Sequence, residues 1–453
     1  MRLNPLVSMV LAMVLVGCEQ KTSAQEQTKT VDLDPGALSA RTAPLIVGAG
    51  VHFGIGGEYG YLLPKTAEIL GQLKLDSFRD DLPWSSFVAS DSGGEGREPA
   101  KLFNFMRITR ARPTLVIGHP NPAVPGGNPP LTPEGRAAFR NFAVAAVKAT
   151  YKANPIYEIW NEWNMNAVTG RPFLVGRGDE SDPRSALYYA PLASETVQEI
   201  SKSFPKATVL VGAVGMDNGW KWTQAIAEMG ALKGASGLSV HMYNHCERNT
   251  ADRTAQEAID RLYDLQKILH PMNEGKDLAI YVTEFGWPTI PKQCPISQQA
   301  AADNIAQFLL WAAATPWLKG AWIYEVKDQG TNPLEMEDNF GLYDYGYAPK
   351  EAACAAQKAV QLIRSSSSFH LERPFKDLFM VQIAAQGGTR LVAWTSREAV
   401  KVMLSLDGNR TAKASRLCMN GDVAGPDIPI GPTPVVIDVE GTSAVSLRAR
   451  LSQ

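Results

Sequence analysis

Strand-like and helix-like segments alternate along most of the chain, and this alternation limits the possible folds more than any other feature of the sequence. Short apolar runs predict strands at residues 45–53, 74–79, 113–118, 157–160, 208–214, 237–243, 279–283 and 319–326. Amphipathic segments predict helices at residues 64–70, 102–110, 185–204, 253–269, 297–314 and 350–364. Thr132-Pro133 supplies the N-cap and first residue of another helix. Eight strand–helix units over about 320 residues favour a (β/α)8 TIM barrel, an α/β fold, over a doubly wound sheet.

The pattern changes after the serine run at residues 365–368. Residues 400–406 alternate with a period of two, and residues 379–384, 390–394, 435–439 and 444–447 also have the composition of strands. We therefore expect the barrel to cover residues 43–368 and a small C-terminal β-sandwich to cover residues 369–453. The sandwich is expected to support the barrel, with glycan binding as the alternative role.

The first eighteen residues have the composition of a bacterial export signal. Arg2 supplies a positive start, residues 6–16 are apolar, and the tetrapeptide Leu-Val-Gly-Cys that ends at Cys18 resembles the lipobox of bacterial lipoproteins, whose cysteine is lipidated. The alternatives are an ordinary cleaved signal and a membrane span, for which the apolar run is short. Residues 19–42 are rich in Gln, Thr, Ser and Lys and are predicted to be a flexible linker. We expect an exported protein that is lipid-anchored to the bacterial cell envelope, in the periplasm or at the outer membrane, and touches the membrane only through this anchor.

Beyond Cys18 the chain has four cysteines, Cys246, Cys294, Cys354 and Cys418. An even number in an exported protein favours disulfides, with three possible pairings, over free buried thiols. Cys246 follows the sixth predicted strand and Cys294 follows the seventh, so they lie in neighbouring loops and are expected to pair. Cys354–Cys418 would then tie the last barrel helix to the sandwich.

Composition argues against several classes of partner. The net charge is −2 and charged residues make up 20% of the chain, so no electrostatic argument favours nucleic acid or an anionic membrane surface. The cysteines lack metal-ligand spacing, and neither a metal nor another cofactor is predicted. We expect the protein to act as a monomer on a polysaccharide or oligosaccharide, for the reasons that follow.

Two of the predicted strands run into a glutamate flanked by aromatic residues. Residues 157–160 lead into Asn161-Glu162 and a tryptophan, and residues 281–283 lead into Glu284, a phenylalanine and a tryptophan. Taken singly, such residues often form turns or solvated surface. In a barrel, however, the carboxyl ends of all strands meet on one face, where catalytic residues gather. Two carboxylates there suit hydrolysis of a glycosidic bond, one as acid/base and one as nucleophile.

This arrangement resembles the clan A glycoside hydrolases, whose barrels carry an acid/base Glu, preceded by Asn, after strand four and a nucleophilic Glu after strand seven. Glu162 and Glu284 match these positions in motif and in order. Within the clan, the chain is most similar to family 39 and to related bacterial exopolysaccharide endoglycosidases, over about residues 45–365. The resemblance implies that Glu284 is the nucleophile, that Glu162 is the acid/base and that Asn161 binds the 2-hydroxyl of the sugar.

The resemblance also implies roles for other residues near strand ends. Arg79 would position the nucleophile, and Trp322 would form the aromatic floor under the reacting sugar. His241 and Tyr243 would hydrogen-bond the sugar and the nucleophile. The alternatives are a structural ion pair for Arg79, a buried hydrogen-bonded histidine and simple packing for Trp322. Weaker candidates for substrate binding are Trp84, His119 and Tyr324, and the choice between substrate contact and ion pair is left open for Asp80, Asp81, Glu325 and Asp328.

Together these features predict a retaining, endo-acting β-glycosidase that cleaves a bacterial exopolysaccharide or envelope glycan. With about 5–5.5 Å between the carboxyl groups, no water fits between nucleophile and sugar, and double displacement through a covalent glycosyl-enzyme retains the anomeric configuration. Exo cleavage, as in β-xylosidases, and transglycosylation would use the same site. A non-catalytic glycan-binding lipoprotein is another alternative, against which the presence of both Glu162 and Glu284 argues. A two-lobed solute-binding protein is disfavoured by the eight barrel units.

Overall fold

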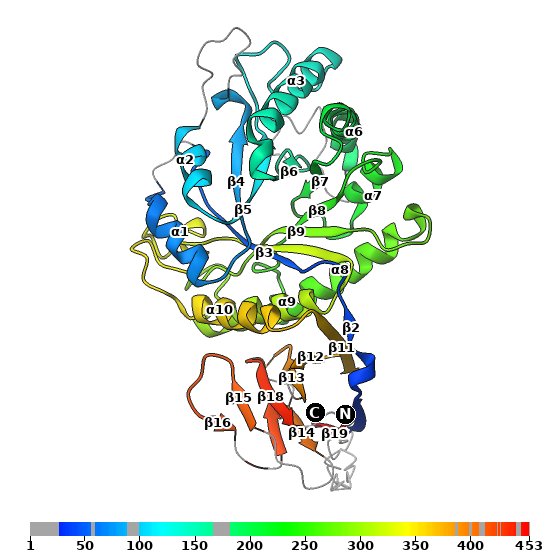
Figure 1. The fold of residues 1–453 in the computed structure, drawn as a ribbon, viewed down its shortest axis with the longest axis vertical. Coiled ribbons are helices and arrows are strands. Elements are labelled where there is room, and N and C mark those ends of the chain that lie inside the picture. The colour runs from blue at the N-terminus through cyan, green and yellow to red at the C-terminus, as the bar shows by residue number, and fades with distance from the viewer. Residues whose placement is uncertain are drawn as a thin grey trace, which may run out of the picture.

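A computed structural model gives the fold of residues 27–55, 59–87, 99–165, 182–385, 388–397, 401–406, 413–423, 425, 427–440 and 445–452. Two parts are evident in Figure 1, a barrel ringed by helices and a smaller all-β part beneath it. The export signal, with Cys18, lies outside the described residues. Within them, no helix is long and apolar enough to cross a membrane.

The larger part is a closed parallel barrel of eight strands, which confirms the predicted (β/α)8 fold. Its strands, in the order in which they hydrogen-bond around the barrel, are β10 (Leu318–Ile323), β3 (Ile46–Gly50), β4 (Ser77–Pro83), β5 (Arg112–Gly118), β6 (Ile156–Ile159), β7 (Thr208–Val214), β8 (Gly237–Met242) and β9 (Ile280–Phe285). The helices that cover it are α1 (Leu63–Gln72), α2 (Ala100–Ile108), α3 (Pro133–Thr150), α6 (Ala186–Ser203), α7 (Lys221–Glu228), α8 (Ala255–Leu269), α9 (Gln298–Ala313) and α10 (Glu351–Arg364).

Among the eight barrel helices described, α3, α8 and α9 begin at a residue whose side chain caps the helix. The hydroxyl of Thr132 accepts the Gly135 N–H at 3.2 Å with a proline at the first helical position of α3, as predicted. Thr254 and Ser297 cap α8 and α9 in the same way. Helix α7 was not predicted, because it has only eight residues and its N-cap position is Trp220, whose side chain caps nothing.

The smaller part is a sandwich of two antiparallel sheets with a core of its own. One sheet has the order β16 (Asp422–Val423), β15 (Lys413–Arg416), β18 (Val435–Glu440), β13 (Gly388–Thr395), β12 (Leu378–Ala385), β11 (Ser368–Phe375) and β2 (Ser39–Ala40). The other has the order β1 (Gln27–Leu33), β19 (Val445–Ser452), β14 (Lys401–Leu406) and β17 (Asp427–Ile430). The predicted C-terminal sandwich is thereby confirmed.

The prediction of a flexible linker over residues 19–42 is wrong for the strands at residues 27–33 and 39–40. Strand β1 pairs with β19 from Gln27↔Leu451 to Leu33↔Val445, and β2 pairs with β11. The composition misleads because β1 is an edge strand: Val31 is buried, whereas the residues from Gln27 to Thr30 are exposed. Its backbone hydrogen bonds hold it in the sheet although its side chains are polar. The first strand of the sandwich therefore comes from the N-terminal side of the barrel.

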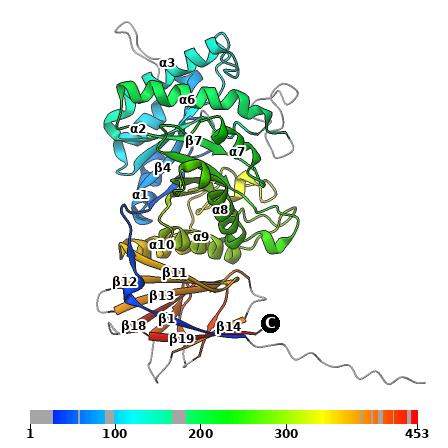
Figure 2. The same cartoon turned by 90° about the vertical axis from the view of Figure 1, so that its right-hand side faces the viewer.

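Helices α9 and α10 lie between the barrel and the sandwich (Figures 1 and 2). Helix α9 is buried on nearly all sides, as expected for a helix covered on two faces. From it, Gln307 Nε2 donates to the carbonyl of Pro432 in the sandwich at 2.7 Å. The predicted pair Cys354–Cys418 is formed, with a Cα–Cα distance of 6.0 Å, and links α10 to the sandwich.

Candidate active site

A cavity of about 550 Å³ opens at the carboxyl ends of the barrel strands. Its walls come from β4 and β9 themselves and from the ends of, or the segments that follow, β3, β5, β6, β7, β8 and β10, so residues far apart in the sequence meet there. Both predicted carboxylates line it. The site therefore has the location expected of a barrel enzyme.

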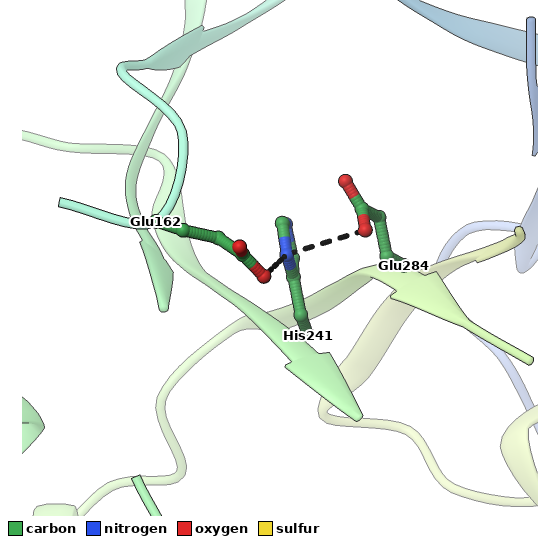
Figure 3. A group of neighbouring side chains, drawn as sticks. All are labelled: Glu162, His241 and Glu284. Carbon is green, nitrogen blue, oxygen red and sulfur yellow. Dashed lines mark hydrogen bonds and ion pairs between the residues drawn. The ribbon is translucent and has the colours of Figure 1, made fainter. Parts of the chain in front are cut away.

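Glu162 and Glu284 face each other across this cavity (Figure 3). Glu284 is on β9, and Glu162 follows β6 with a φ of 44°, in the left-handed region. The Glu162 N–H donates to the carbonyl of Ala213 on β7 at 2.9 Å, which holds this unusual backbone conformation in place. A carboxylate oxygen of Glu162 and a carboxylate oxygen of Glu284 lie within 4.8 Å of each other. This short separation is the one associated with a retaining mechanism.

His241 lies between the two carboxylates, as Figure 3 shows. Its Nδ1 is 2.9 Å from Glu162 Oε1 and 3.4 Å from Glu284 Oε2, and its side chain is fully buried. Burial by itself lowers the pKa of His241, but the charge of Glu284 and the hydrogen bond to Glu162 outweigh burial and raise it. The imidazole is thus a donor that both carboxylates share.

Two further donors fix Glu284. Arg79 Nη1 donates to Oε1 at 2.5 Å, and the Tyr243 hydroxyl donates to Oε2 at 2.5 Å. Arg79 Nη2 also donates to Asn161 Oδ1 at 2.8 Å, which leaves the amide nitrogen of Asn161 for another partner. Burial and the charge of Glu284 raise the pKa of Tyr243 well above its usual range, so the phenol keeps its proton. The structure brings together Arg79, Asn161, Glu162, His241, Tyr243 and Glu284.

The ends of β3, β4 and β5 bring a second set of charged residues to the site, among them Asp80 and Asp81, whose roles the sequence left undecided. His119 Nε2 is 2.7 Å from Asp81 Oδ1; although burial raises the pKa of Asp81, His119 lowers it to about 2. His52 Nε2 is 3.1 Å from Glu325 Oε2; although burial lowers the pKa of His52, Glu325 raises it to about 9. Burial and the charge of Asp81 raise the pKa of Asp80 to about 7. His119 therefore lines the cavity, as predicted, beside His52, Asp80 and Asp81. The position of these residues near strand ends was the feature of the sequence that could have indicated a place in the site.

Two tryptophan predictions are wrong. Trp322 is fully buried deep in the barrel, beside Ile156 and Leu210, and its indole N–H donates to Ser77 Oγ at 3.0 Å. A Cβ added to Gly48 would lie 2.3 Å from that indole, so the ring fills the interior below the cavity. Trp84 packs against Phe142 with ring centroids 5.8 Å apart, and is core.

Tyr324, two residues beyond Trp322, lines the cavity as predicted. Tyr324 directly follows the carboxyl end of β10, where the cavity opens, whereas Trp322 lies inside the barrel. The Tyr324 hydroxyl donates to Glu337 Oε2 at 2.8 Å. Asp328, by contrast, is an ion-pair residue, because its Oδ1 is 2.6 Å from Lys350 Nζ.

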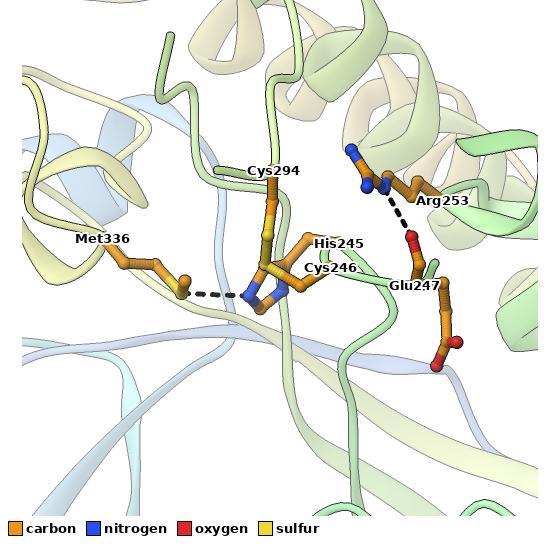
Figure 4. The surroundings of a disulfide bond; sticks show 6 residues. All are labelled: His245, Cys246, Glu247, Arg253, Cys294 and Met336. Atoms are coloured by element: carbon orange, nitrogen blue, oxygen red, sulfur yellow. Dashed lines mark hydrogen bonds between the residues drawn. A yellow bond between two sulfur atoms is a disulfide. The ribbon is translucent and has the colours of Figure 1, made fainter. Parts of the chain in front are cut away.

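The loop after β8 is fixed by the predicted disulfide Cys246–Cys294, whose Cα atoms are 5.0 Å apart (Figure 4). Beside it, His245 Nε2 is 3.0 Å from Met336 Sδ, and Arg253 Nε donates to the carbonyl of Glu247 at 2.8 Å. Burial and the charge of Arg253 lower the pKa of His245 to about 4. The disulfide therefore anchors the segment that carries Tyr243 to the segment that follows Glu284.

Glu162, His241 and Glu284 are also the group whose spacing would suit a metal ion among the described residues. A cation there would lie beside the guanidinium of Arg79 and compete with it for Glu284. The hydrogen bonds from His241, Arg79 and Tyr243 already use the same oxygens. The group is better suited to transferring protons than to holding a metal.

No protein-family model and no curated protein sequence matches this chain, whereas many solved structures do. A family 39 glycoside hydrolase from the gut symbiont Bacteroides cellulosilyticus WH2 is 20% identical, with a TM-score of 0.66 over 88% of this chain and 81% of that one. A monomeric β-xylosidase from Caulobacter crescentus CB15 is 12% identical, with a TM-score of 0.56 over 92% of this chain and 98% of that one. A 4-O-α-L-rhamnosyl-β-D-glucuronidase from Fusarium oxysporum 12S is 11% identical, with a TM-score of 0.58 over 94% and 99% of the two chains. The chain has the fold of these hydrolases, and the expected resemblance to family 39 is confirmed for the fold.

Proposed function

We propose that the protein is a retaining glycoside hydrolase that acts inside a bacterial exopolysaccharide or envelope glycan with β linkages. The observation that carries the proposal is the pair Glu162 and Glu284, whose nearest oxygens lie within 4.8 Å at the carboxyl ends of β6 and β9. The likeness in fold to several glycoside hydrolases supports it. The contacts around each carboxylate support different roles for the two.

Glu284 is suited to attack the anomeric carbon. Arg79 and Tyr243 each donate a hydrogen bond to its carboxylate, which holds the carboxylate in place for the attack. Glu162, on the other side of the sugar, gives its proton to the leaving oxygen as the glycosyl–Glu284 ester forms. Glu162 then takes a proton from the incoming water, which attacks the anomeric carbon and releases Glu284. Two inversions leave the configuration of the sugar unchanged.

Asn161 has a matching role in binding. Its carbonyl oxygen accepts from Arg79 at 2.8 Å, so its NH2 group is the part that can donate to a sugar hydroxyl. The 2-hydroxyl of the reacting sugar is the group we assign to it. Such a contact strengthens as the transition state forms.

The proposal also covers the substrate and the cellular location of the protein. The lipobox-like motif ending at Cys18 supports an exported, lipid-anchored protein that meets glycans of the cell envelope, and we propose that it acts as a monomer. Exo cleavage is a second candidate, favoured by the likeness to a β-xylosidase over 92% of this chain. The enzymes of similar fold are named for different sugars, so the likeness in fold does not identify the sugar on which this protein acts.

The test is a screen of the purified protein on bacterial exopolysaccharides and β-linked oligosaccharides, followed by reducing-end assay and by NMR of the first anomer released. We expect a ladder of oligosaccharides with retained configuration, and no activity from Glu284→Gln. Release of single sugars would instead support the exo alternative. An inverted first product, or full activity in Glu284→Gln, would refute the mechanism.

A further inference from the structure

A third glutamate lies directly beneath the two at the cavity. Glu158 is on β6, four residues before Glu162, and its side chain is fully buried. Arg79 Nε donates to its Oε2 at 2.7 Å, and the Thr283 hydroxyl donates to its Oε1 at 2.7 Å. A buried carboxylate is tolerated only with such partners. Both partners adjoin the proposed nucleophile, since Arg79 binds Glu284 and Thr283 precedes it.

Three short contacts fix the guanidinium of Arg79 in one orientation, and Nη2 also lies 3.4 Å from His241 Nε2. Nε is held by Glu158, Nη1 by Glu284 and Nη2 by Asn161. Because the guanidinium is planar, the bond at Nε determines where the other two nitrogens point. Glu158 thus sets the position of the groups that hold the nucleophile and the amide.

Glu158 also supplies charge that the reaction needs. Burial lowers the pKa of Arg79, and the charge of Glu158, followed by that of Glu284, outweighs this and raises it. When Glu284 becomes an ester in the glycosyl-enzyme, it loses its negative charge. Arg79 would then be a buried cation with one fewer partner, and Glu158 is the carboxylate still paired with it, with a smaller contribution from the charge of Asp81.

We infer that Glu158 is a positioning residue, which orients Arg79 and balances its charge while Glu284 is glycosylated. The inference rests on the proposed function. Glu158 itself does not contact the substrate, because it is fully buried and does not line the cavity. Its loss should therefore slow formation of the glycosyl-enzyme, because a nucleophile that must neutralise Arg79 alone attacks less readily.

The kinetic test compares Glu158→Gln with Thr283→Val. Glu158→Gln keeps the size of the side chain and removes its charge, and should lower kcat/KM by about 10²–10³-fold with no accumulation of the intermediate. Thr283→Val removes the hydrogen bond to Oε1 and keeps the charge, and should lose less than about 10-fold. Equal losses in the two variants would mean that only packing matters, and would overturn the inference.

A second measurement needs no substrate. In protein labelled with ¹⁵N-arginine, the Nε–H signal of Arg79 is identified by its absence in Arg79→Lys. We expect it to shift upfield and to exchange faster with water in Glu158→Gln, but to stay in place in Thr283→Val. An unchanged signal in Glu158→Gln would overturn the inference.

The two measurements separate the inference from the function on which it rests. If the wild-type protein cleaves no glycan while the Arg79 signal responds as expected, the proposed function fails and the orientation of Arg79 by Glu158 stands. If Glu158→Gln does not fold, Glu158→Asp serves instead, since it keeps the charge and withdraws it from Arg79. Wild-type kcat and an unshifted Arg79 signal in Glu158→Asp would refute the positioning role.

Discussion

Replacing Tyr243 with phenylalanine removes one oxygen atom and, with it, the 2.5 Å hydrogen bond to Glu284 Oε2. This bond favours the ionised carboxylate, which is present in the free enzyme and absent from the glycosyl-enzyme. Tyr243 should therefore help Glu284 to leave in the second step more than it helps Glu284 to attack in the first. Because the pKa of Tyr243 is well above its usual range, the phenol donates throughout the neutral pH range.

A hydrogen bond to a charged group contributes about 1.5–3 kcal/mol. Lost at the transition state of the second step, this amounts to a fall of about 10–100-fold in that rate. With an aryl β-glycoside of the sugar identified by the screen, whose good leaving group makes the second step limiting, kcat should fall by this factor. KM should fall as well, because the glycosyl-enzyme accumulates, and kcat/KM should change much less.

The assay is stopped-flow release of the aryl alcohol, in which Tyr243→Phe should show a burst equal to the enzyme concentration. Tyr157→Phe is the matched control. Its hydroxyl is hydrogen-bonded to Thr150 Oγ1 at 2.9 Å in the buried barrel wall, so it should lose about 0.5–1.5 kcal/mol of unfolding free energy and no activity. Equal falls in kcat and kcat/KM for Tyr243→Phe, without a burst, would refute the reasoning.

Three other predictions test the carboxylates, the disulfide and the anchor. Glu284→Ala should be inactive and yield an inverted glycosyl azide when azide is added, whereas Glu162→Ala should yield a retained one and lose about 10²–10⁴-fold, most with poor leaving groups; exchanged products would reverse the two roles. Replacing Cys354 and Cys418 with serine opens a 64-residue loop and should cost about 4 kcal/mol of unfolding free energy in denaturant titration, and an unchanged midpoint would contradict this. Cys18→Ser should abolish labelling by a radioactive fatty acid in cells, and labelling that persists would exclude this residue as the anchor.

Local features of the sequence were sufficient to predict the barrel and the two carboxylates. Each strand has its own apolar run, and Asn161-Glu162 and Glu284 stand directly at strand ends. The depth of a side chain inside the barrel was not predictable in the same way. Trp322 and Tyr324 are two residues apart, and which of them reaches the cavity depends on how all eight strands stagger.

The contacts of buried charged residues were the second feature that the sequence did not predict. Glu158 lies in a segment whose apolar residues predict a buried strand, and a glutamate inside such a strand is itself a signal, because it needs buried partners. His52 and Glu325 come from opposite ends of the barrel sequence, and only closure between β3 and β10 brings them together. Pairing between distant segments carries no pattern in a single sequence.

The place of β1 determines how far the protein can work from a membrane. Strand β1 belongs to the outer sheet of the sandwich, whereas β11–β13 face the barrel (Figure 2). With Cys18 lipidated, as proposed, nine residues separate the lipid from Gln27, and a chain of that length reaches about 30 Å when fully extended. The anchor would then join the protein at the outer sheet of the sandwich, and the second sheet, about 10 Å away, lies between that sheet and the barrel. The barrel, and with it the cavity, would therefore be the part of the protein farther from the point of attachment.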